Sequence, residues 1–321
     1  MKVLIADDDD VLRHILEASL TKWGYESVIA RNGLEAWRIL QEDDAPKLAI
    51  LDWVMPGMDG PTVCREIRKL EDRPYIYVLL LTSKHRKEDV IAGLEAGADD
   101  YVSKPFDPHE LKVRLRAGRR ILDLQSELLA ARESLRYQAT HDGLTGLMNR
   151  SATLEALGNE LERAARQGTP ICLMLADFDH FKGINDTYGH SAGDAVLCEA
   201  ARRMRTSVRT YDHVGRYGGE EFLFILPGCD TEDARNQAER LKTSITAQPI
   251  ELPSLAISFS ISIGTVVKYN PVLEDLEALV QAADAALYEA KLRGRNRVVV
   301  SESSDFQSKN SPVLAFAPPH A

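Results

Sequence analysis

The first 120 residues alternate short apolar runs with segments of helical periodicity, and no other feature of the 321-residue chain constrains the fold more strongly. Between the runs, apolar residues recur at spacings of three and four, as at Val11, Ile15 and Leu16, which is typical of amphipathic helices. Alternating strands and helices predict a doubly wound parallel sheet with helices on both faces. The predicted strands are 3–6, 27–30, 48–51, 78–81 and 101–102.

Polar side chains stand at the ends of four of these strands. The carboxyl ends of parallel strands meet at one edge of a sheet, so these side chains are expected to lie together. Clustered carboxylates favour a divalent cation with oxygen ligands, such as Mg²⁺, and an aspartate beside that cation can attack a phosphoryl group. A lone aspartate at such a position is more commonly a helix N-cap. The residues concerned are Asp7, Asp8, Asp9, Asp10, Asp52, Thr82, Ser83 and Lys104.

In this order and spacing, the residues resemble the response-regulator receiver domain, a flavodoxin-like fold, over residues 1 to about 120. The resemblance implies that Asp52 accepts the phosphoryl group from a cognate histidine kinase or a small phosphodonor. Asp9 and Asp10 go beyond the family's pattern. The metal ligands that the resemblance implies are Asp7, Asp8, Asp52 and the carbonyl of Trp53. The switch and phosphoryl-binding residues that it implies are Thr82, Tyr101 and Lys104.

A single helix is predicted over residues 108–138, with a linker helix or coiled coil at 121–140 between two domains. Apolar residues alternate there at spacings of four and three, which is the a/d pattern of a coiled coil over roughly three heptads. An ordinary amphipathic helix packed on its own domain is the alternative. The first stripe is Ala117, Ile121, Leu124, Leu128, Ala131, Leu135 and Gln138. The second stripe, beside it, is Leu115, Leu122 and Leu129.

Residues 141–300 predict a second α/β domain, with strands at 171–176, 222–226, 257–263 and 297–300. Gly218 and Gly219 predict a tight turn that is followed directly by Glu220 and Glu221. Adjacent carboxylates repel unless a cation lies between them, although a solvated acidic turn is the alternative. Asp177 ends an apolar strand and could share Mg²⁺ with Glu220, and that metal could bridge a triphosphate. Residues 301–321 are rich in Ser, Pro and Ala and predict a disordered tail.

Further polar residues of this domain suit a guanine nucleotide. An aspartate can accept from two N–H groups of guanine, and an asparagine amide can pair with a purine edge, which suits Asp194 and Asn185. Lysine and arginine supply donors for phosphates. Taken alone, such cations are more commonly a solvated helix face, and Asn185 a turn residue. The phosphate-binding candidates are Lys182, Lys291 and Arg295.

The motifs DGLTGLMNR, DFDHFKGIND, GHSAGD, GGEEF and KLRGRN occur in order, and they resemble the GGDEF diguanylate cyclase domain, which has a nucleotidyl-cyclase-like fold. The resemblance implies metal binding, by Mg²⁺ or else Mn²⁺, through Asp177, the Phe178 carbonyl and Glu220. Glu221 either binds metal or activates the 3′-hydroxyl. The residues implied to read guanine are Asn185 and Asp194, and Lys182, Lys291 and Arg295 are implied to hold phosphates. The residues implied to bind the inhibitory product are Arg209, Asp212 and Arg240.

Together these resemblances imply a cytoplasmic response regulator that condenses two GTP molecules into cyclic di-GMP and two pyrophosphates. Its receiver would be phosphorylated, its product would inhibit it, and it would work as a homodimer or a higher oligomer. A catalytically silent module that binds GTP or cyclic di-GMP is the alternative. DNA is disfavoured as a partner because the net charge is −10 and no helix-turn-helix pattern is found.

No membrane partner is expected, because no apolar run has the length of a membrane span and the N-terminal run is too short for a signal peptide. The four cysteines form no CxxC pair and are expected to be buried or free thiols in a reducing compartment.

Overall fold

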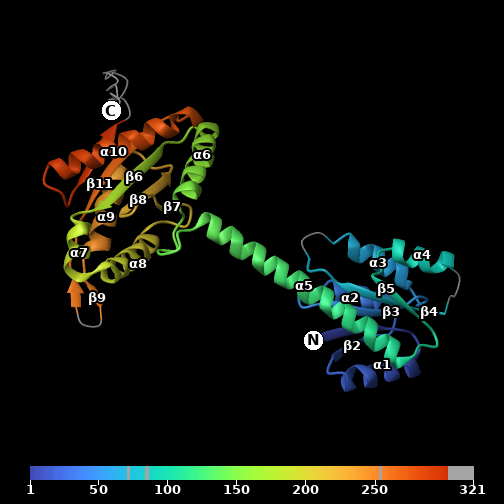
Figure 1. The fold of residues 1–321 in the computed structure, drawn as a ribbon. Coiled ribbons are helices and arrows are strands. Elements are labelled where there is room, and N and C mark those ends of the chain that lie inside the picture. The colour runs from blue at the N-terminus through green and yellow to red at the C-terminus, as the bar shows by residue number, and fades with distance from the viewer. Residues whose placement is uncertain (71–72, 84–86, 253–254, 303–321) are drawn as a thin grey trace, which may run out of the picture. The chain divides into compact units, whose positions relative to one another are not determined.

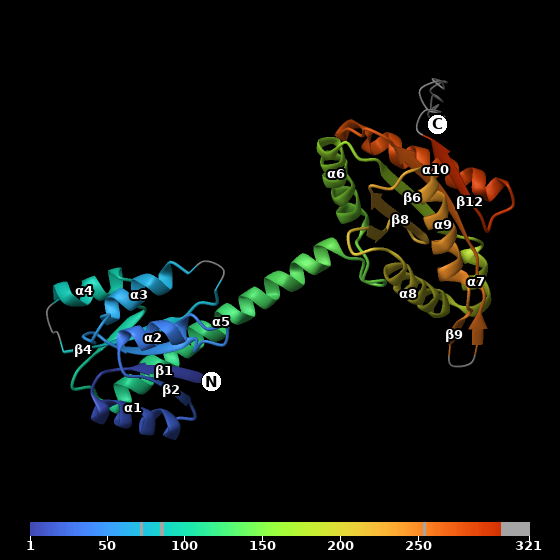
Figure 2. The same cartoon turned by 180° about the vertical axis from the view of Figure 1, so that it is seen from behind.

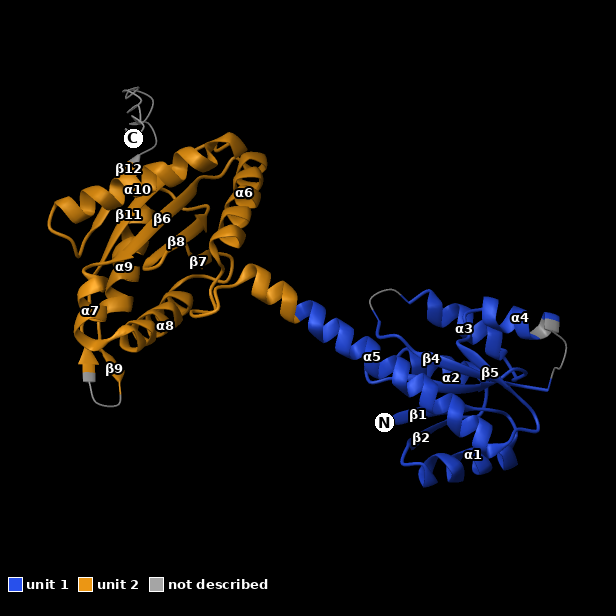
Figure 3. Ribbon diagram, viewed as in Figure 1, with its two compact units in different colours: residues 1–133 blue, residues 134–321 orange. Residues whose placement is uncertain are grey.

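A computed structural model describes residues 1–70, 73–83, 87–252 and 255–302 of the chain. The chain divides into two compact units, Met1–Glu133 and Ser134–Ala321 (Figure 3). The predicted C-terminal tail lies outside the described residues from residue 303 onward. No helix among the described residues is both long and apolar enough to cross a membrane.

The first unit is a parallel sheet in the order β2-β1-β3-β4-β5, which confirms the predicted doubly wound fold (Figure 1). Each predicted strand is present and is one or two residues longer than predicted. The observed strands are β1 (Lys2–Ala6), β2 (Glu26–Ala30), β3 (Leu48–Asp52), β4 (Tyr77–Thr82) and β5 (Asp100–Ser103). The helices of this unit are α1 (Asp10–Lys22), α2 (Gly33–Leu40), α3 (Gly60–Arg68), α4 (Lys87–Glu95) and the beginning of α5 (Pro108–Thr140).

Two apolar layers bury the faces of this sheet. Leu16 and Leu20 of α1 pack with Leu111 and Leu115 of α5 on one face, and helices α2 and α3 cover the other. Asp9 is the N-cap of α1, because its carboxylate accepts from the amides of residues 11 and 12 at 2.8 and 3.3 Å. Asp9 and Asp10 go beyond the pattern of the receiver family, and this contact gives Asp9 a structural role.

Helix α5 is continuous from Pro108 to Thr140, as predicted, and the boundary between the two units falls within it. The second of the two predicted apolar stripes on this helix is largely buried and does not run free beside the first. Leu115 and Leu122 are 0% and 6% exposed because they belong to the core of the first unit, and only Leu129 of the second stripe is exposed. The large apolar residues of the first stripe are about half exposed or more, at Ile121, Leu124, Leu128 and Leu135.

The second unit contains a sheet in the order β12-β11-β6-β8-β7, in which β6 is antiparallel to both of its neighbours. Its strands are β6 (Ile171–Phe178), β7 (His213–Arg216), β8 (Glu221–Pro227), β11 (Ile261–Lys268) and β12 (Val298–Glu302). The hairpin of β9 (Ile250–Leu252) and β10 (Leu255–Ile257) is separate. The sequence did not reveal β7 or β9, and the single strand predicted at 257–263 is wrong. Residues 258–260 between β10 and β11 are not strand, although the Asp179 amide still donates to the Ser260 carbonyl at 2.9 Å.

Helices cover both faces of this second sheet (Figures 1 and 2). Apolar residues of α7, α8 and α9 pack on one face, and those of α6 and α10 pack on the other. Gly264 lets α10 approach β11 closely, because a Cβ there would come within 2.1 Å of the Leu287 amide nitrogen. The helices are α6 (Arg150–Gln167), α7 (Phe181–Tyr188), α8 (His190–Ser207), α9 (Thr231–Thr246), the 3-10 turn η1 (Leu273–Asp275) and α10 (Leu276–Leu292).

Candidate functional sites

The first site lies at the carboxyl ends of β1 and β3. Asp7, Asp8 and Asp52 can each point an oxygen into one group in which all ligand atoms lie within 4.8 Å of one another. Lys104 follows β5, and its ammonium lies 2.8 Å from Asp7 Oδ2 and 2.7 Å from Asp52 Oδ1. The parallel sheet therefore brings together residues almost a hundred positions apart, as the sequence predicted.

Burial dominates the electrostatics of this site. It raises the pKa of Asp52, an effect that the hydrogen bond from Lys104 opposes. Burial would lower the pKa of Lys104, but its bonds to Asp52 and Asp7 outweigh burial and raise that pKa. Asp7 is fully buried and Asp52 is 7% exposed. An all-oxygen group of clustered carboxylates suits a hard cation such as Mg²⁺.

The other predicted receiver residues surround this acidic group. The Trp53 amide donates to Asp52 Oδ1 at 2.9 Å. The Trp53 carbonyl accepts from the Gly60 amide at 3.0 Å, and its role as a metal ligand stays a prediction. Thr82 is fully buried at the end of β4, and Tyr101 is half-buried against the core on the α2–α3 side of the sheet. Their roles as switch residues stay predictions.

The second site is built on the antiparallel strands β6 and β8. Their register places Asp177, at the end of β6, directly opposite Glu221. The amides of Tyr217 and Gly218 donate to the Glu221 carbonyl at 2.8 and 3.2 Å, which closes the glycine turn. A Cβ at Gly218 would lie 2.3 Å from the Glu221 carboxylate, so glycine at this position makes room for that side chain.

Burial raises the pKa values of Asp177, Glu220 and Glu221, and the charge of Asp177 raises those of both glutamates further. Lys291, in the last turn of α10, binds Asp177 Oδ1 at 2.8 Å, and this ion pair opposes the rise in the pKa of Asp177. Arg295 also lies close enough for its charge to act on Asp177. Unlike the receiver group, these three carboxylates do not converge within 4.8 Å in the described part of the chain. The Phe178 amide donates to the Glu220 carbonyl at 3.4 Å.

Asp179 supports this site, and the sequence did not reveal its role. Its carboxylate is buried and accepts from the hydroxyls of Ser260 and Ser262, each at 2.7 Å, and from the Asn296 amide at 3.0 Å. It thus joins β6 to β11 and to the loop that carries Arg295. A sequence signal existed, because serines two residues apart in a strand share one face of a sheet.

The predicted guanine-binding residues lie at the junction of α7 and α8. Gly193 leaves space for the Asn185 amide, since a Cβ there would come within 2.0 Å of Asn185 Oδ1. Asp194 follows directly and is exposed in the first turns of α8, and Lys182 is exposed at the start of α7. That these residues bind a guanine nucleotide stays a prediction.

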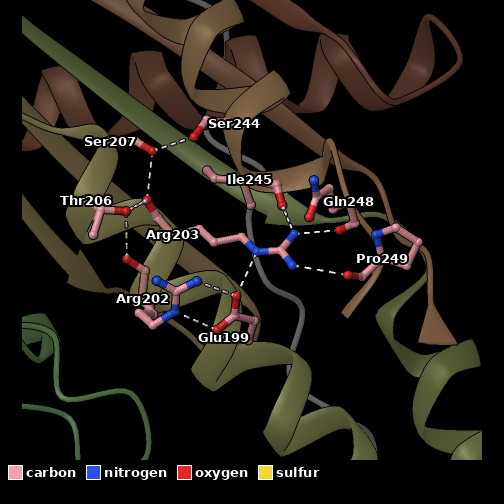
Figure 4. Close-up of polar contacts among 9 residues, drawn as sticks. All are labelled: Glu199, Arg202, Arg203, Thr206, Ser207, Ser244, Ile245, Gln248 and Pro249. Atoms are coloured by element: carbon pink, nitrogen blue, oxygen red, sulfur yellow. Dashed lines mark hydrogen bonds and ion pairs between the residues drawn. The ribbon is translucent and has the colours of Figure 1, made fainter. Parts of the chain in front are cut away.

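Arg203 anchors α8, the helix that carries Asp194 (Figure 4). Its guanidinium donates to the carbonyls of Ile245, Gln248 and Pro249 at 2.8, 2.6 and 3.2 Å, and to Glu199 at 2.9 Å. These bonds tie α8 to the end of α9 and the approach to β9. Because the guanidinium satisfies three carbonyls that no helix or strand pairs, Arg203 is a structural residue.

A third group follows α8 at the predicted product-binding turn. The Arg209 amide donates to Asp212 Oδ2 at 2.8 Å, and the exposed Arg209 guanidinium donates to the Tyr211 hydroxyl at 2.8 Å. Burial raises the pKa of Asp212, and the charges of Arg209, His213 and Arg240 oppose that rise. The charge of Arg240, on α9, therefore also acts on this turn, and the role of these residues in product binding stays a prediction.

A polar chain connects the end of α5 with the glycine turn, and sequence reasoning missed it. Asp142 accepts from the Thr145 amide and hydroxyl and from Arg216 Nη1 at 2.9, 2.7 and 3.1 Å. Burial would raise the pKa of Asp142, but the bonds from Thr145 and Arg216 outweigh it and lower that pKa. Arg216 also donates to the Gly219 carbonyl at 3.1 and 2.7 Å. The Arg216 side chain therefore connects the segment that follows α5 to the glycine turn.

All four cysteines are free thiols, and Cys64, Cys172 and Cys229 are buried, as expected. Burial raises the pKa of Cys64 to about 12, so this thiol is unreactive at neutral pH.

Two family models match the chain. The response regulator receiver domain matches residues 3–116, and the diguanylate cyclase GGDEF domain matches residues 139–297. The response regulator PleD of Caulobacter vibrioides is 35% identical over 261 residues, which cover 78% of this chain and 56% of PleD. The diguanylate cyclase DgcP of Pseudomonas aeruginosa is 39% identical over 216 residues, which cover 65% of this chain and 32% of DgcP. The chain thus spans about half the length of PleD and a third of DgcP.

The chain is also similar to solved structures, among them the following two. Diguanylate cyclase SiaD of Pseudomonas aeruginosa, solved with its activator SiaC, is 39% identical with a TM-score of 0.50 and covers 60% of this chain and 74% of its own. The coiled coil and GGDEF domain of DgcB from Caulobacter crescentus, solved with c-di-GMP, is 32% identical with a TM-score of 0.53. That comparison covers 60% of this chain and 99% of the DgcB chain.

Proposed function

The chain belongs to the GGDEF family and carries a response-regulator receiver domain ahead of its GGDEF domain, and on this basis we propose that it is a diguanylate cyclase controlled by phosphorylation. The observation that carries the proposal is the placement of Asp177 opposite Glu221, with Glu220 beside it and Lys291 on Asp177. Carboxylates whose pKa values are raised by burial and mutual repulsion gain stability from a divalent cation.

The reaction joins two GTP molecules. The 3′-oxygen of one GTP attacks the α-phosphorus of the other, the new P–O bond forms, and the bond to the β-phosphate breaks to release pyrophosphate. In the reciprocal step, the 3′-oxygen of the second nucleotide attacks the α-phosphorus of the first. This step closes the ring of cyclic di-GMP and releases the second pyrophosphate. Glu221 is the candidate to take the proton of the 3′-hydroxyl. Catalysis of this kind rests on positioning and on charge stabilisation.

The residues divide among three tasks. Asp177, the Phe178 carbonyl and Glu220 would hold Mg²⁺ or Mn²⁺, which supplies electrophilic activation of the triphosphate when bound. Guanine would be read by Asn185 and Asp194. The phosphates would be held by Lys182, Lys291 and Arg295. Each domain would hold one GTP, so an active unit requires two domains facing each other, and we propose a homodimer or a higher oligomer.

Regulation would act through the receiver and through the product. Asp52 would accept a phosphoryl group from a histidine kinase or a small phosphodonor, with Mg²⁺ on the acidic group and Lys104 binding the phosphoryl oxygens. The exposed stripe of α5 at Ile121, Leu124, Leu128 and Leu135 would pair two chains. Cyclic di-GMP would bind Arg209, Asp212 and Arg240 and inhibit. Because GTP and phosphodonors are cytoplasmic metabolites, we place the protein in the cytoplasm.

The test is product formation by the purified full chain with GTP and Mg²⁺, read by nucleotide chromatography with and without a small phosphodonor. Cyclic di-GMP and pyrophosphate are expected in a ratio of one to two. Glu221→Gln is expected to abolish turnover without loss of fold, whereas the control Glu232→Gln, at an exposed position on α9, is expected to retain it. Bound GTP with no product in any condition would instead support a silent nucleotide-binding regulator.

A further inference from the structure

A cavity of about 480 Å³ lies beside the predicted product-binding turn, entirely within the second unit. It belongs to the size range of small-molecule sites, which is roughly 300–1,000 Å³. Its walls come from the last turn of α5, the turn that follows α5, and the segment from α8 to β7. The residues that carry the argument below are Tyr137, His141, Arg205, Arg209 and Asp212.

One part of the cavity lining is aromatic. The rings of Tyr137 and His141 stack with centroids 4.0 Å apart and planes 10° from parallel. His141 Nδ1 lies 2.9 Å from the Thr140 hydroxyl, which fixes the orientation of the imidazole. The backbone of His141 also bridges to Met148. This pair therefore presents one continuous flat surface, and Tyr137 is 52% exposed.

Another part of the lining is charged. Arg205, in the last turn of α8, is exposed, and its guanidinium has no hydrogen bond or ion pair within the described ranges of the chain. Arg209 follows four residues later, and within the described part of the chain its guanidinium contacts Tyr211, both at the hydroxyl and over the ring. Asp212 is half-buried and accepts from the Arg209 amide. Two guanidinium groups suit phosphodiester anions, and a carboxylate suits the two N–H donors on the guanine edge.

A cavity lined by a flat aromatic surface, two cations and one carboxylate has the chemistry of a site for a guanine dinucleotide. We propose that a guanine base of bound cyclic di-GMP stacks on the Tyr137–His141 pair, so that the product touches the last turn of α5 as well as the turn at Arg209. The inference rests on the proposed product inhibition and extends it. The ligand then contacts the helix that leads to the receiver unit, and product occupancy restrains the end of that helix directly.

The affinity test uses the full-length protein titrated calorimetrically with cyclic di-GMP in the absence of GTP. Tyr137→Leu and His141→Leu remove one ring each, and the expected loss of affinity is roughly 5- to 150-fold, the range that measured base–aromatic stacking energies convert to. Tyr137→Phe and His141→Phe keep a ring and should bind within about threefold of the wild type, on the same stacking argument. Tyr288→Leu, at an exposed tyrosine on α10 outside the cavity, is the matched control and should not change binding. Arg209→Ala is the reference for the product site.

The outcomes separate this inference from the function on which it rests. If Arg209→Ala weakens binding while both leucine variants bind like the wild type, the stacking wall is wrong and the product site stands. If Arg209→Ala also binds like the wild type, the proposed product site itself is wrong. Equal losses in the leucine and phenylalanine variants would show that the rings only position the turn, and would overturn the proposal.

A second measurement does not depend on removing a ring. The tryptophans of the chain are Trp23, Trp37 and Trp53, all in the first unit. A Tyr137→Trp variant therefore adds a tryptophan at the proposed wall, and a stacked guanine should quench its fluorescence. Saturable quenching beyond that of the wild type is expected on titration with cyclic di-GMP. Binding by calorimetry without added quenching would overturn the proposal.

Discussion

Replacing Asp179 is predicted to destabilise the second unit by an amount that depends on what replaces it. The carboxylate accepts three hydrogen bonds, from Ser260, Ser262 and the Asn296 amide. In Asp179→Ala all three donors lose their partner. Ser262 is fully buried, so its hydroxyl bears the full penalty of about 1.5–3 kcal/mol for a lost bond to a charged group. Ser260 and Asn296 are partly or well exposed and can recruit water, at about 1 kcal/mol each.

The sum predicts that Asp179→Ala lowers the free energy of unfolding by roughly 3–5 kcal/mol, a large part of a typical domain's total. Asp179→Asn is predicted to cost only about 1–2 kcal/mol. Its amide oxygen can take the place of Oδ2 for Ser260 and Asn296, and its NH₂ group can donate to the Ser262 hydroxyl, which rotates to accept. What is lost is the charge assistance of these bonds, which makes them about twice as strong as neutral ones.

The assay is urea unfolding of the full chain followed by far-UV circular dichroism, with the receiver transition followed separately by the fluorescence of its tryptophans. Asp186→Asn, which removes an exposed carboxylate on α7, is the control and should shift stability by less than about 0.5 kcal/mol. Product formation should also fall in Asp179→Asn, because the loop that carries Arg295 loses its charged anchor. An alanine variant as stable as the asparagine variant would refute the hydrogen-bond reasoning.

Four further predictions concern regulation and electrostatics. Arg209→Ala should sustain synthesis after the wild type has stalled, because alanine cannot make the paired bonds of a guanidinium; identical inhibition curves for added cyclic di-GMP would contradict this. Burial raises the pKa of Glu220 in the folded protein, so ionisation of this carboxyl group disfavours folding. The protonated group stabilises the fold at pH values below its unfolded-state pKa, and this contribution is lost as the pH rises through the folded-state pKa. Glu220→Gln should therefore raise the melting temperature of the second unit in metal-free protein at neutral pH, and Mg²⁺ should stabilise that unit more in the wild type than in the variant; a lower melting temperature would count against it. Beryllofluoride should raise activity roughly 5- to 150-fold if the coupling is about 1–3 kcal/mol, and Asp52→Asn should remove that response. Glutamate at both Leu124 and Leu128, which are 54% and 69% exposed, should abolish the phosphodonor response with each unit still folded; an intact response would show that the helix is a passive tether.

Local sequence patterns predicted the receiver fold because each element reveals itself within a few residues. Strand runs of four or five apolar residues and helices of regular period identify a parallel sheet, and a parallel sheet brings its strand ends together. Asp7, Asp52 and Lys104 could therefore be placed in one site before any coordinates were known. Asp177 and the glycine turn are brought together differently, by the antiparallel register of β6 and β8, and the metal binding inferred from their residue types and order stays a prediction.

Periodicity shows which residues share a face, but it does not show what covers that face. The stripe of Leu115, Leu122 and Leu129 looked continuous, yet the first two belong to the receiver core and only the last is exposed. Nothing local distinguishes these leucines from Leu124 or Leu128, because the difference depends on where the sheet ends. The tertiary structure alone decides which part of α5 is free to pair.

The polar residues that hold the second site in place could not be identified from the sequence either. Asp179 binds Asn296, which is 117 residues away, and Arg216 reaches Asp142 across 74 residues while holding Gly219. Each of these residues, read alone, is an unremarkable polar side chain between apolar runs. Sequence determines the groups that perform the chemistry, since their types and order are specific. Only the folded chain decides which groups hold them in place, because a buried carboxylate or guanidinium takes its partners from whichever distant backbone the packing of the core brings within hydrogen-bonding distance.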